Sequence, residues 1–292
     1  MPSTRDLRRR IKSIRNTSQI TKAMQMVAAS KMRKAQQAAL AGRPYAALMN
    51  NVLAEVTANA GDFTHPLMEK REAGKQALIV VSTDKGLCGA LNSNLLREAG
   101  KYDKDKTLYL TAGRKASQYI ARTKRQLAAE FTYKDTPLFS EARAISKSAQ
   151  TMFINGEVDR VDILFTNFIS TLNQKPEVRQ LLPVGVIKGV RAEVSGEEAG
   201  EELHKGGTEF LFEPNAENVL GALLPHYLNF MVYQILLEAK ASEHSARMVA
   251  MKNATDNAKQ LIKDLTLEYN KLRQANITKE LLEITSAAMA MG

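Results

Sequence analysis

The chain has 292 residues, 44% of them hydrophobic and 25% charged, a composition typical of soluble globular proteins that excludes disorder over most of its length. Its longest mostly apolar stretch, residues 228–237, is well short of the roughly 20 residues that a membrane-spanning helix needs, so we expect no membrane insertion. No apolar signal-peptide segment follows the charged N-terminus, and one cysteine with four scattered histidines argues against a disulfide or a structural zinc site. We expect a cytoplasmic protein of bacterial type without a cofactor.

The positive charge of the chain is concentrated at its N-terminal end. Residues 1–43 hold eleven lysines and arginines and one acidic residue, Asp6, so their net charge of +10 equals that of the whole chain. Such a block can bind nucleic acid, anionic lipid or an acidic protein surface, and charge alone does not choose among them. Residues 1–44 contain no Phe, Tyr or Trp on which bases could stack, so we expect no nucleic acid partner.

The first predicted element is one long helix over about residues 3–59. The segment contains one glycine and one proline, Gly42 and Pro44, and is rich in good helix formers; the proline is a place where the helix can kink. Its apolar residues form a narrow stripe, which predicts pairing with a second helix rather than a globular core. The stripe consists of Leu7, Ile11, Ile14, Ile20, Met24, Val27, Ala28, Met32 and Ala35.

The middle of the chain has a different texture. Short apolar or β-branched runs alternate with helical stretches, a pattern that predicts a parallel sheet with right-handed crossovers in a small Rossmann-like layer. Residues 178–186 are compatible with a further strand, and the acidic residues 196–202 with an exposed loop between two final strands. The expected strands are 77–83, 107–113, 126–133 and 161–171, and the expected helices are 92–99, 114–122 and 140–155.

No catalytic constellation is present in the sequence. The nearest candidate, residues 84–89 at the end of the first strand, has two glycines three residues apart, but it lacks the GxGxxG pattern and a ribose-binding acid on the second strand. A tight structural turn is the favoured interpretation over a phosphate site. Cys88 in this turn is interpreted as a small buried residue rather than a reactive thiol.

The last predicted element is a helix of about 65 to 70 residues, from Ala222 to Met291. Met251, Ala254, Ala258, Leu261, Leu265, Leu272 and Ala275 keep a heptad spacing in it, with Glu268 as the one polar interruption. Because the first helix enters the central domain and this helix leaves it, the two must pair antiparallel. The last helix is longer, so its tip should extend beyond its partner and need other protein around it.

Four sequence blocks resemble the γ subunits of F-type ATP synthases. These are IRNTSQITKAMQMVAASKMRKAQ (14–36), STDKGLCGALN (82–92), ARMVAMKNATDNA (246–258) and YNKLRQANITKELLEI (269–284), in the order that the family has them. The resemblance departs from the family at 286–290, where a glycine is common and this chain has Ser286-Ala287-Ala288-Met289-Ala290. It implies an antiparallel coiled coil of the terminal helices around a central Rossmann-like α/β domain, divided as 1–59, 75–213 and 214–292.

The resemblance also implies a function without catalytic residues. In the family, this subunit is the rotor shaft inside the α₃β₃ hexamer, its foot rests with the ε subunit on the ring of c subunits, and proton flow turns it at the cytoplasmic face of the bacterial inner membrane. Family positions that contact the hexamer match Arg8, Arg9, Lys12, Lys22, Met24, Arg247, Arg273, Gln274, Thr278, Glu280 and Glu283, and positions near the c ring match Glu209, Phe210 and Phe212.

Two other classes of function stay open on the residues alone. A stand-alone coiled-coil adaptor or chaperone would grip clients with the two helices and use the α/β domain as a scaffold. A nucleotide-binding α/β enzyme would use the turn at 84–89. A rotor shaft should co-purify in a fixed complex with ATPase activity, whereas an adaptor or an enzyme should be stable alone.

Overall fold

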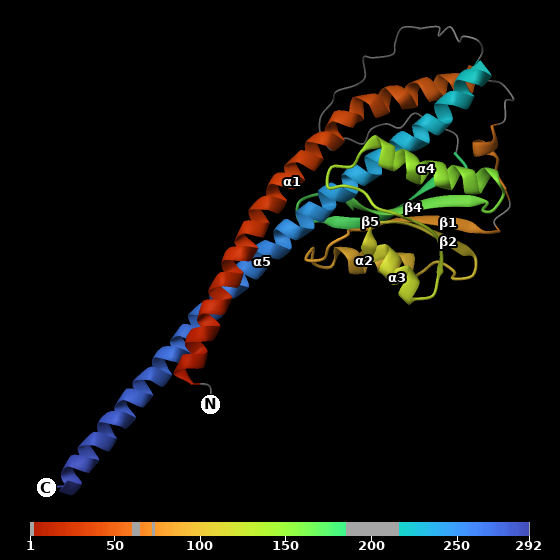
Figure 1. Cartoon of the computed structure of the whole chain (residues 1–292). Coiled ribbons are helices and arrows are strands. Elements are labelled where there is room, and N and C mark those ends of the chain that lie inside the picture. The colour runs from red at the N-terminus through yellow and green to blue at the C-terminus, as the bar shows by residue number, and fades with distance from the viewer. Residues whose placement is uncertain (1–2, 60–64, 72–73, 185–215, 292) are drawn as a thin grey trace.

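A computed structural model describes residues 3–59, 65–71, 74–184 and 216–291 of the chain. Two long helices run side by side and project from an α/β foot, and one of them continues alone past the end of the other (Figure 1). The elements in chain order are α1 (Thr4–Asn59), the short 3₁₀ helix η1 (Pro66–Met68), β1 (Gln76–Val81), α2 (Leu91–Ala99), β2 (Thr107–Ala112), α3 (Arg114–Arg122), β3 (Gln126–Phe131), α4 (Phe139–Ile154), β4 (Arg160–Phe168), β5 (Gln174–Leu182) and α5 (Ala216–Met291).

The foot is a five-stranded sheet with the strand order β3-β2-β1-β4-β5. The first four strands are parallel, as predicted, and alternate with helices. The further strand expected at 178–186 is present as β5, but it starts at Gln174, four residues earlier, and pairs antiparallel with β4. The reason is the tight turn at Ser170–Asn173, whose two backbone hydrogen bonds are compatible only with a hairpin. The predicted loop at 196–202 lies outside the described residues.

The helices cover both faces of the sheet. Helices α2 and α3 lie on one face, over Leu78 and Val80, whereas α4 and α5 lie on the other, over Ile79 and Phe165 (Figure 1). The central strand β1 is apolar on both faces because both are covered. The predicted fold class, a mixed α/β protein with long terminal helices, is confirmed.

Helix α5 begins at Ala216, six residues before the predicted start, and continues through Gly221 and Pro225. Its first turns bury Leu220, Leu224 and Leu228 on the foot, and this packing offsets the poor helix propensity of the glycine and the proline. One helix among the described residues, Asn218–Met289, is long enough to span a membrane and contains an 18-residue window with a mean hydropathy of 1.3, but 39% of that window is buried inside the chain. Core helices pass the same test.

The paired stretch of α1 and α5 is a heptad seam. The predicted stripe on α1 is right at Leu7, Ala28 and Met32, but Ile20 and Val27 are 60% and 55% exposed. The seam residues of α1 are Leu7, Ile11, Ile14, Ser18, Thr21, Gln25, Ala28, Met32 and Ala35, and those of α5 are Met251, Thr255, Ala258, Ile262, Leu265, Tyr269 and Leu272.

Both sets have strict four-and-three spacing, which is that of a coiled coil. The prediction for α5 was wrong at Leu261, which is 47% exposed, and at Ala275, which lies beyond the end of α1. It was also wrong at Ala254, because it rejected polar residues, whereas the seam position is Thr255, whose hydroxyl pairs with that of Thr21 across the seam at 2.7 Å.

Candidate functional site

The end of the shaft is the first feature that needs a partner. Across the seam, the Arg8 guanidinium donates to the Tyr269 hydroxyl at 2.6 Å and lies over its ring, close to the point where α1 begins. Beyond Leu272, every described side chain of α5 through Met289 is exposed. This overhang, residues 273–289, is about 25 Å long at the rise of an α-helix.

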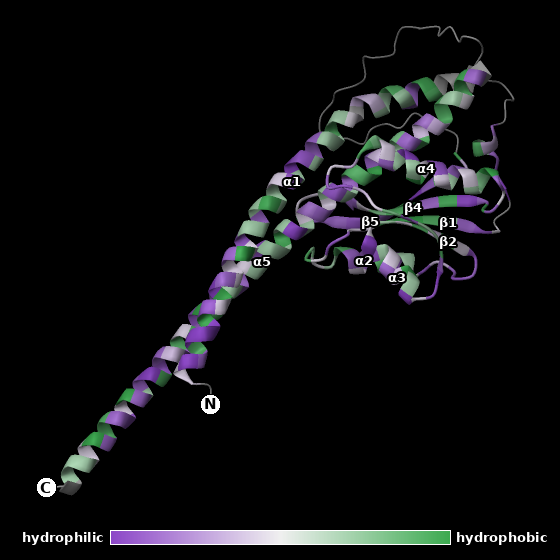
Figure 2. Cartoon of the chain, viewed as in Figure 1, coloured by the Kyte–Doolittle hydropathy of each residue, from purple (hydrophilic) through white to green (hydrophobic). Residues whose placement is uncertain are grey.

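The overhang is not a polar solvated helix. Leu281, Leu282 and Ile284 are 57%, 61% and 66% exposed, and Met289 is 86% exposed. Figure 2 shows hydrophobic residues spread among hydrophilic ones down to this end of α5. A single helix with this many bare apolar side chains is poorly stabilised in water, so its geometry calls for surrounding protein.

The predicted contact residues of the last segment all lie on this overhang. Arg273, Gln274, Thr278, Glu280 and Glu283 are exposed, and Glu283 pairs with Lys279 at 3.7 Å on the surface. None of them packs against α1, so each is available to a partner along the length of the helix.

The predicted contact residues of α1 are spread along the shaft. Arg8, Arg9 and Lys12 precede Met24 by 12 residues or more, which separates them from it by at least about 18 Å along a helix. They therefore lie well away from Met24 along the helix, whereas Lys22 is two residues from it. All four basic residues are exposed, and Lys22 also reaches Gln25 at 3.4 Å.

Met24 lies where the shaft meets the foot. It is half-buried and lines a cavity of about 430 Å³ between α1, α5 and the carboxyl ends of β1 and β3. The α1 side of the cavity is apolar apart from Lys31, with Ile20 and Val27 beside Met24, and the opposite side holds, besides His244, six charged residues. These are Asp84, Lys85, Asp135, Lys240, Glu243 and Arg247.

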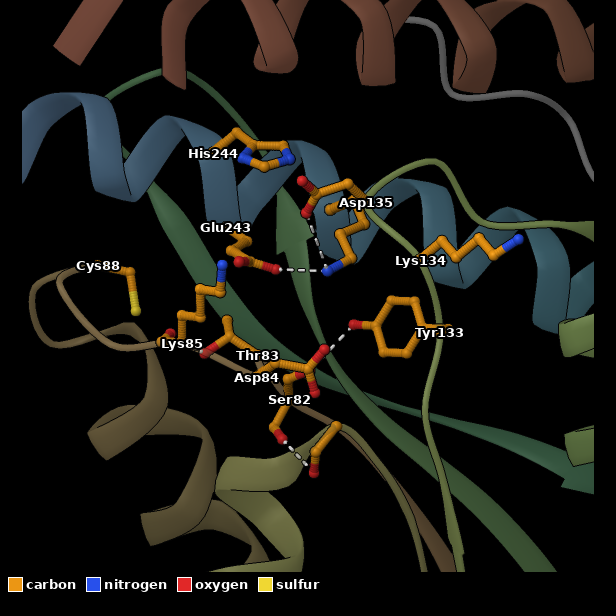
Figure 3. A network of polar contacts seen from close by, with 12 residues as sticks. Ser82, Thr83, Asp84, Lys85, Cys88, Tyr133, Lys134, Asp135, Glu243 and His244 are labelled. Atoms are coloured by element: carbon orange, nitrogen blue, oxygen red, sulfur yellow. Dashed lines mark hydrogen bonds and ion pairs between the residues drawn. The ribbon is translucent and has the colours of Figure 1, made fainter. Parts of the chain in front are cut away.

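The opposite side of this cavity is a network of polar contacts, which we call the joint (Figure 3). Glu243 and His244 extend from α5, Tyr133 and Asp135 from the segment after β3, and Ser82 to Lys85 from the end of β1. Tyr133 is 5% exposed, and its hydroxyl donates to the Ser82 carbonyl at 3.0 Å. Burial raises the pKa of this phenol well above its ordinary value, so it stays protonated and can donate.

Charged residues of α5 are buried at the joint. The side chains of Lys240 and Glu243 are 3% and 5% exposed, and the Lys240 ammonium donates to the Glu243 carboxylate at 3.0 Å. Arg247, 13% exposed, binds the other carboxylate oxygen of Glu243 at 2.8 Å. Arg247 was predicted to contact the hexamer, but most of its side chain lies inside the chain.

His244 is the one member of the joint with an unsatisfied atom. It is 2% exposed; its Nδ1 lies 3.5 Å from the Arg247 guanidinium, and its Nε2 has no hydrogen-bond partner among the described residues. Burial lowers the pKa of the imidazole, so the neutral form is favoured. With a cationic donor at Nδ1, the proton of the neutral ring is placed on Nε2.

The turn at 84–89 has a structural role in the geometry. The Asp84 carboxylate accepts from the Arg114 backbone N–H at 3.0 Å and so caps the start of α3, and Asn92 donates to Thr83 and to the Cys88 thiol. Cys88 is 2% exposed, and burial raises the pKa of its thiol. The polar groups of this turn thus form hydrogen bonds within the foot, and a structural turn is what the sequence predicted.

Sequence reasoning missed the joint. Lys31, Asp135, Lys240, Glu243 and His244 come from three separate segments, and nothing in the sequence pairs them. One signal was present in the sequence. Lys240, Glu243 and His244 lie in an alanine-containing part of the long last helix, which is of a composition that suits burial against the foot. The predicted c-ring contacts Glu209, Phe210 and Phe212 lie outside the described residues.

The fold and its bare end define an elongated shaft carried on an α/β foot. The family model described as ATP synthase matches residues 3–291. Relatives named ATP synthase gamma chain are 47% identical in Methylacidiphilum infernorum, over 100% of both chains, and 49% identical in Opitutus terrae, over 99% of both. The chain belongs to the family of ATP synthase gamma chains.

Solved structures agree with this membership. The mitochondrial ATP synthase central stalk and c ring of Tetrahymena thermophila matches with a TM-score of 0.60 and 26% identity, over 80% of this chain and 99% of that one. A chain of the Euglena gracilis mitochondrial enzyme matches in fold, with a TM-score of 0.70 and 20% identity over 99% and 94% of the two chains. The resemblance inferred from four sequence blocks is confirmed, and with it the role of a rotor shaft.

Proposed function

We propose that this chain works as a non-catalytic shaft that turns inside a hexamer of alpha and beta subunits and carries torque to or from a ring of c subunits. The single observation that carries this is the bare overhang 273–289, where one helix exposes Leu281, Leu282 and Ile284 and none of the described residues of the chain covers them. A sleeve of surrounding protein would cover these residues at any angle of the helix.

The mechanism follows from the asymmetry of the shaft. A coiled coil of two helices, with α1 on one side only, presents a different surface in each direction, so three equivalent catalytic subunits around it would contact different residues. Each subunit would then be biased toward the conformation that its contacts favour, and rotation would move that bias from one subunit to the next. The shaft itself needs no catalytic residue and no cofactor for this.

We assign the contacts by position along the chain. Toward the hexamer these are the exposed basic residues of α1 and the polar residues of the overhang, for which acidic loops of the beta subunits are the expected partners. Toward the c ring and the epsilon subunit it is the foot, including Glu209, Phe210 and Phe212. The division into 1–59, 75–213 and 214–292, and a peripheral location on the cytoplasmic face of the bacterial inner membrane, are parts of the same proposal.

The test is to watch the foot move. The complex is immobilised through its hexamer, the buried Cys88 is replaced by serine, and a bead is attached at Ile154→Cys, which is 52% exposed on the foot. MgATP should drive rotation of the bead in one direction. A foot that stays still while the complex hydrolyses ATP would overturn the proposal, and a control complex without the chain should not carry the bead.

The alternative functions give other outcomes. A coiled-coil adaptor would be recovered alone, with client proteins in amounts that vary with growth conditions, and it would not appear in a fixed complex with ATPase activity. A nucleotide-binding enzyme would bind MgATP as the isolated chain. We expect neither, because the overhang needs permanent cover and the turn at 84–89 directs its polar groups to its own fold.

A further inference from the structure

The joint contains a chain of five charges of alternating sign, which we call the clasp: Lys31, Asp135, Lys240, Glu243 and Arg247. Lys31 of α1 binds Oδ2 of Asp135, and the Lys240 ammonium lies 3.9 Å from Oδ1 of the same carboxylate. Lys240 and Arg247 each bind one oxygen of Glu243. Each anion therefore lies between two cations.

The clasp joins four segments that are far apart in the sequence. Lys31 stands on α1, Asp135 on the segment between β3 and α4, and the other three residues on α5. At the far end, the Arg247 guanidinium reaches the backbone carbonyls of Lys85 and Gly86 at 3.4 and 3.3 Å. The clasp thus connects α1 to the loop that precedes α2.

Helix α1 reaches the foot at two places besides its packing against α5. Met49 and Leu53, near its C-terminal end, are buried in the foot core, and Lys31, 18 residues before Met49, makes the one ion pair of α1 with another element among the described residues. A heptad seam fixes α1 relative to α5 and not relative to the sheet. Asp135 therefore lies where α1 can be fixed relative to the foot rather than relative to α5 alone.

The burial of these charges also argues for positioning over simple stabilisation. Lys240 and Glu243 are at most 5% exposed in their side chains, and buried ion pairs of this kind are seldom more stable than apolar residues of the same volume. What they add is geometry, because each charge accepts only the arrangement that brings its partner into contact. Lys31 holds the pKa of the Asp135 carboxyl below its ordinary value, so the anion is present whenever the protein is folded near neutral pH.

We propose that Asp135 is a positioning residue of the shaft: by holding Lys31 on one side and Lys240 on the other, it fixes the angle of α1 against the foot and keeps Arg247 in line through Glu243. The position of α1 follows from the contacts alone. The consequence for torque rests on the proposed function, because a shaft whose two helices turn unequally with the foot loses part of each step.

The experiment measures the position of α1 directly. In the assembled complex with Cys88→Ser, spin labels are placed at Gln37→Cys on α1 and at Ile154→Cys on α4, both exposed positions, and the distance distribution between them is recorded. Asp135→Asn, which keeps the shape and removes the charge, is compared with Asp135→Glu. The matched control is Glu98→Gln, which breaks the surface ion pair with Lys101 on the same foot.

We expect Asp135→Asn to raise the population with a displaced α1 by about fivefold, the equivalent of roughly 1 kcal/mol for one partly exposed pair. Asp135→Glu should restore a narrow distribution, and Glu98→Gln should leave it unchanged. Lys31→Met should also raise the displaced population, and the two substitutions together should be no worse than Asp135→Asn alone, because that variant already loses the contact with Lys31. Lys31→Met also serves if Asp135→Asn does not fold, since Lys31 is 44% exposed in its side chain.

A distribution as narrow in Asp135→Asn and Lys31→Met as in the parent would overturn the proposal. Protons pumped per ATP hydrolysed are measured on the same complexes in membrane vesicles and should fall in the variants whose distribution broadens. Broadening with unchanged pumping would leave the clasp as the device that positions α1 and would contradict the proposed transmission of torque through that angle. The two failures are thus distinguishable.

Discussion

Two stretches of α5, one on the foot and one at its C-terminal end, share one helical backbone and have opposite surroundings. From Leu224 to Ser245 the helix packs between α1, α4 and the sheet, and buried residues occur on every side of it. From residue 273 to 289 no described side chain is buried. Between them lies the seam, where only one stripe of the helix is covered.

This gradient shows what each part of the helix can do. The buried stretch, from Leu224 to Ser245, is held by contacts with its own chain and transmits whatever force the foot receives. The overhang is not packed against any described residue of its own chain, so its apolar residues can be buried only in contact with another protein. The joint marks the transition, and there the helix exchanges apolar burial for paired charges that specify one geometry.

The largest effect is expected from deletion of the overhang. Ending the chain after Asn270 keeps the seam from Met251 to Tyr269 but removes Arg273, Gln274 and the residues after them. The complex should assemble, and its torque and coupled ATP synthesis should fall several-fold, because the contacts with the hexamer are lost. Single-molecule torque and ATP synthesis in vesicles measure this.

The matched control ends the chain after Ser286 and removes three alanines, two methionines and a glycine, of which each methionine is worth at most about 1.5–3 kcal/mol of burial. Assembly and synthesis should largely survive. Full synthesis in the long truncation, or failed assembly in the short one, would show that the helix is not divided into seam and contact region as the exposure indicates.

The second prediction compares one substitution in the buried stretch with one in the overhang. Leu236→Ala removes a fully buried side chain from the foot core and should cost about 2–5 kcal/mol of the free energy of unfolding. Leu281→Ala, at a 57% exposed position, should change it by no more than about 0.5 kcal/mol. Urea unfolding of the purified chain measures both; equal losses would mean that the overhang packs on its own chain in solution.

Sequence reasoning predicted most of the fold because its signals are local. The four parallel strands, the helices between them and the two long helices all follow from runs of residues that suit one period. The errors have physical causes outside those runs. The start of α5 was placed too late because tertiary packing of Leu220 and Leu224 outweighs Gly221 and Pro225, and the antiparallel β5 depends on a four-residue turn.

The site was predicted only in part for the same reason. The overhang residues such as Arg273 and Thr278 were proposed as contacts from resemblance and length, which are properties of one segment, and their contacts stay a prediction. The joint depends on Lys31, Asp135 and Glu243 meeting in space, and no rule of periodicity or spacing brings residues together across 104 and 108 positions. Arg247 was recognised, yet its burial against Glu243 is visible only in three dimensions.

The third prediction concerns the seam, between the two extremes. Thr255→Val keeps the shape and breaks the hydrogen bond with Thr21, which should cost about 1 kcal/mol in the free energy of unfolding. Thr285→Val on the overhang loses only a bond to its own helix, from its hydroxyl to the Leu281 carbonyl, and should be neutral. If both variants unfold at the same urea concentration as the parent, the threonine pair does not specify the seam.

The smallest expected effect is on pH dependence at the joint. The pKa of His244 is lowered in the folded chain by burial, so below its ordinary value of 6.5 the unfolded chain takes up a proton that the folded chain does not. Stability contributed by the neutral imidazole is therefore complete above that value and is lost as the pH falls below it. His244→Gln keeps a polar side chain that does not titrate, so between about pH 7.5 and about pH 5.5 it should lose less stability than the parent chain. Asp135 does not obscure the comparison, because its pKa lies below its ordinary value of 3.8 and its contribution is lost only in stronger acid. Unfolding free energies measured in urea across this range test the sign: parallel curves for parent and variant would show that His244 is not held neutral at the joint, whereas converging curves at low pH are expected.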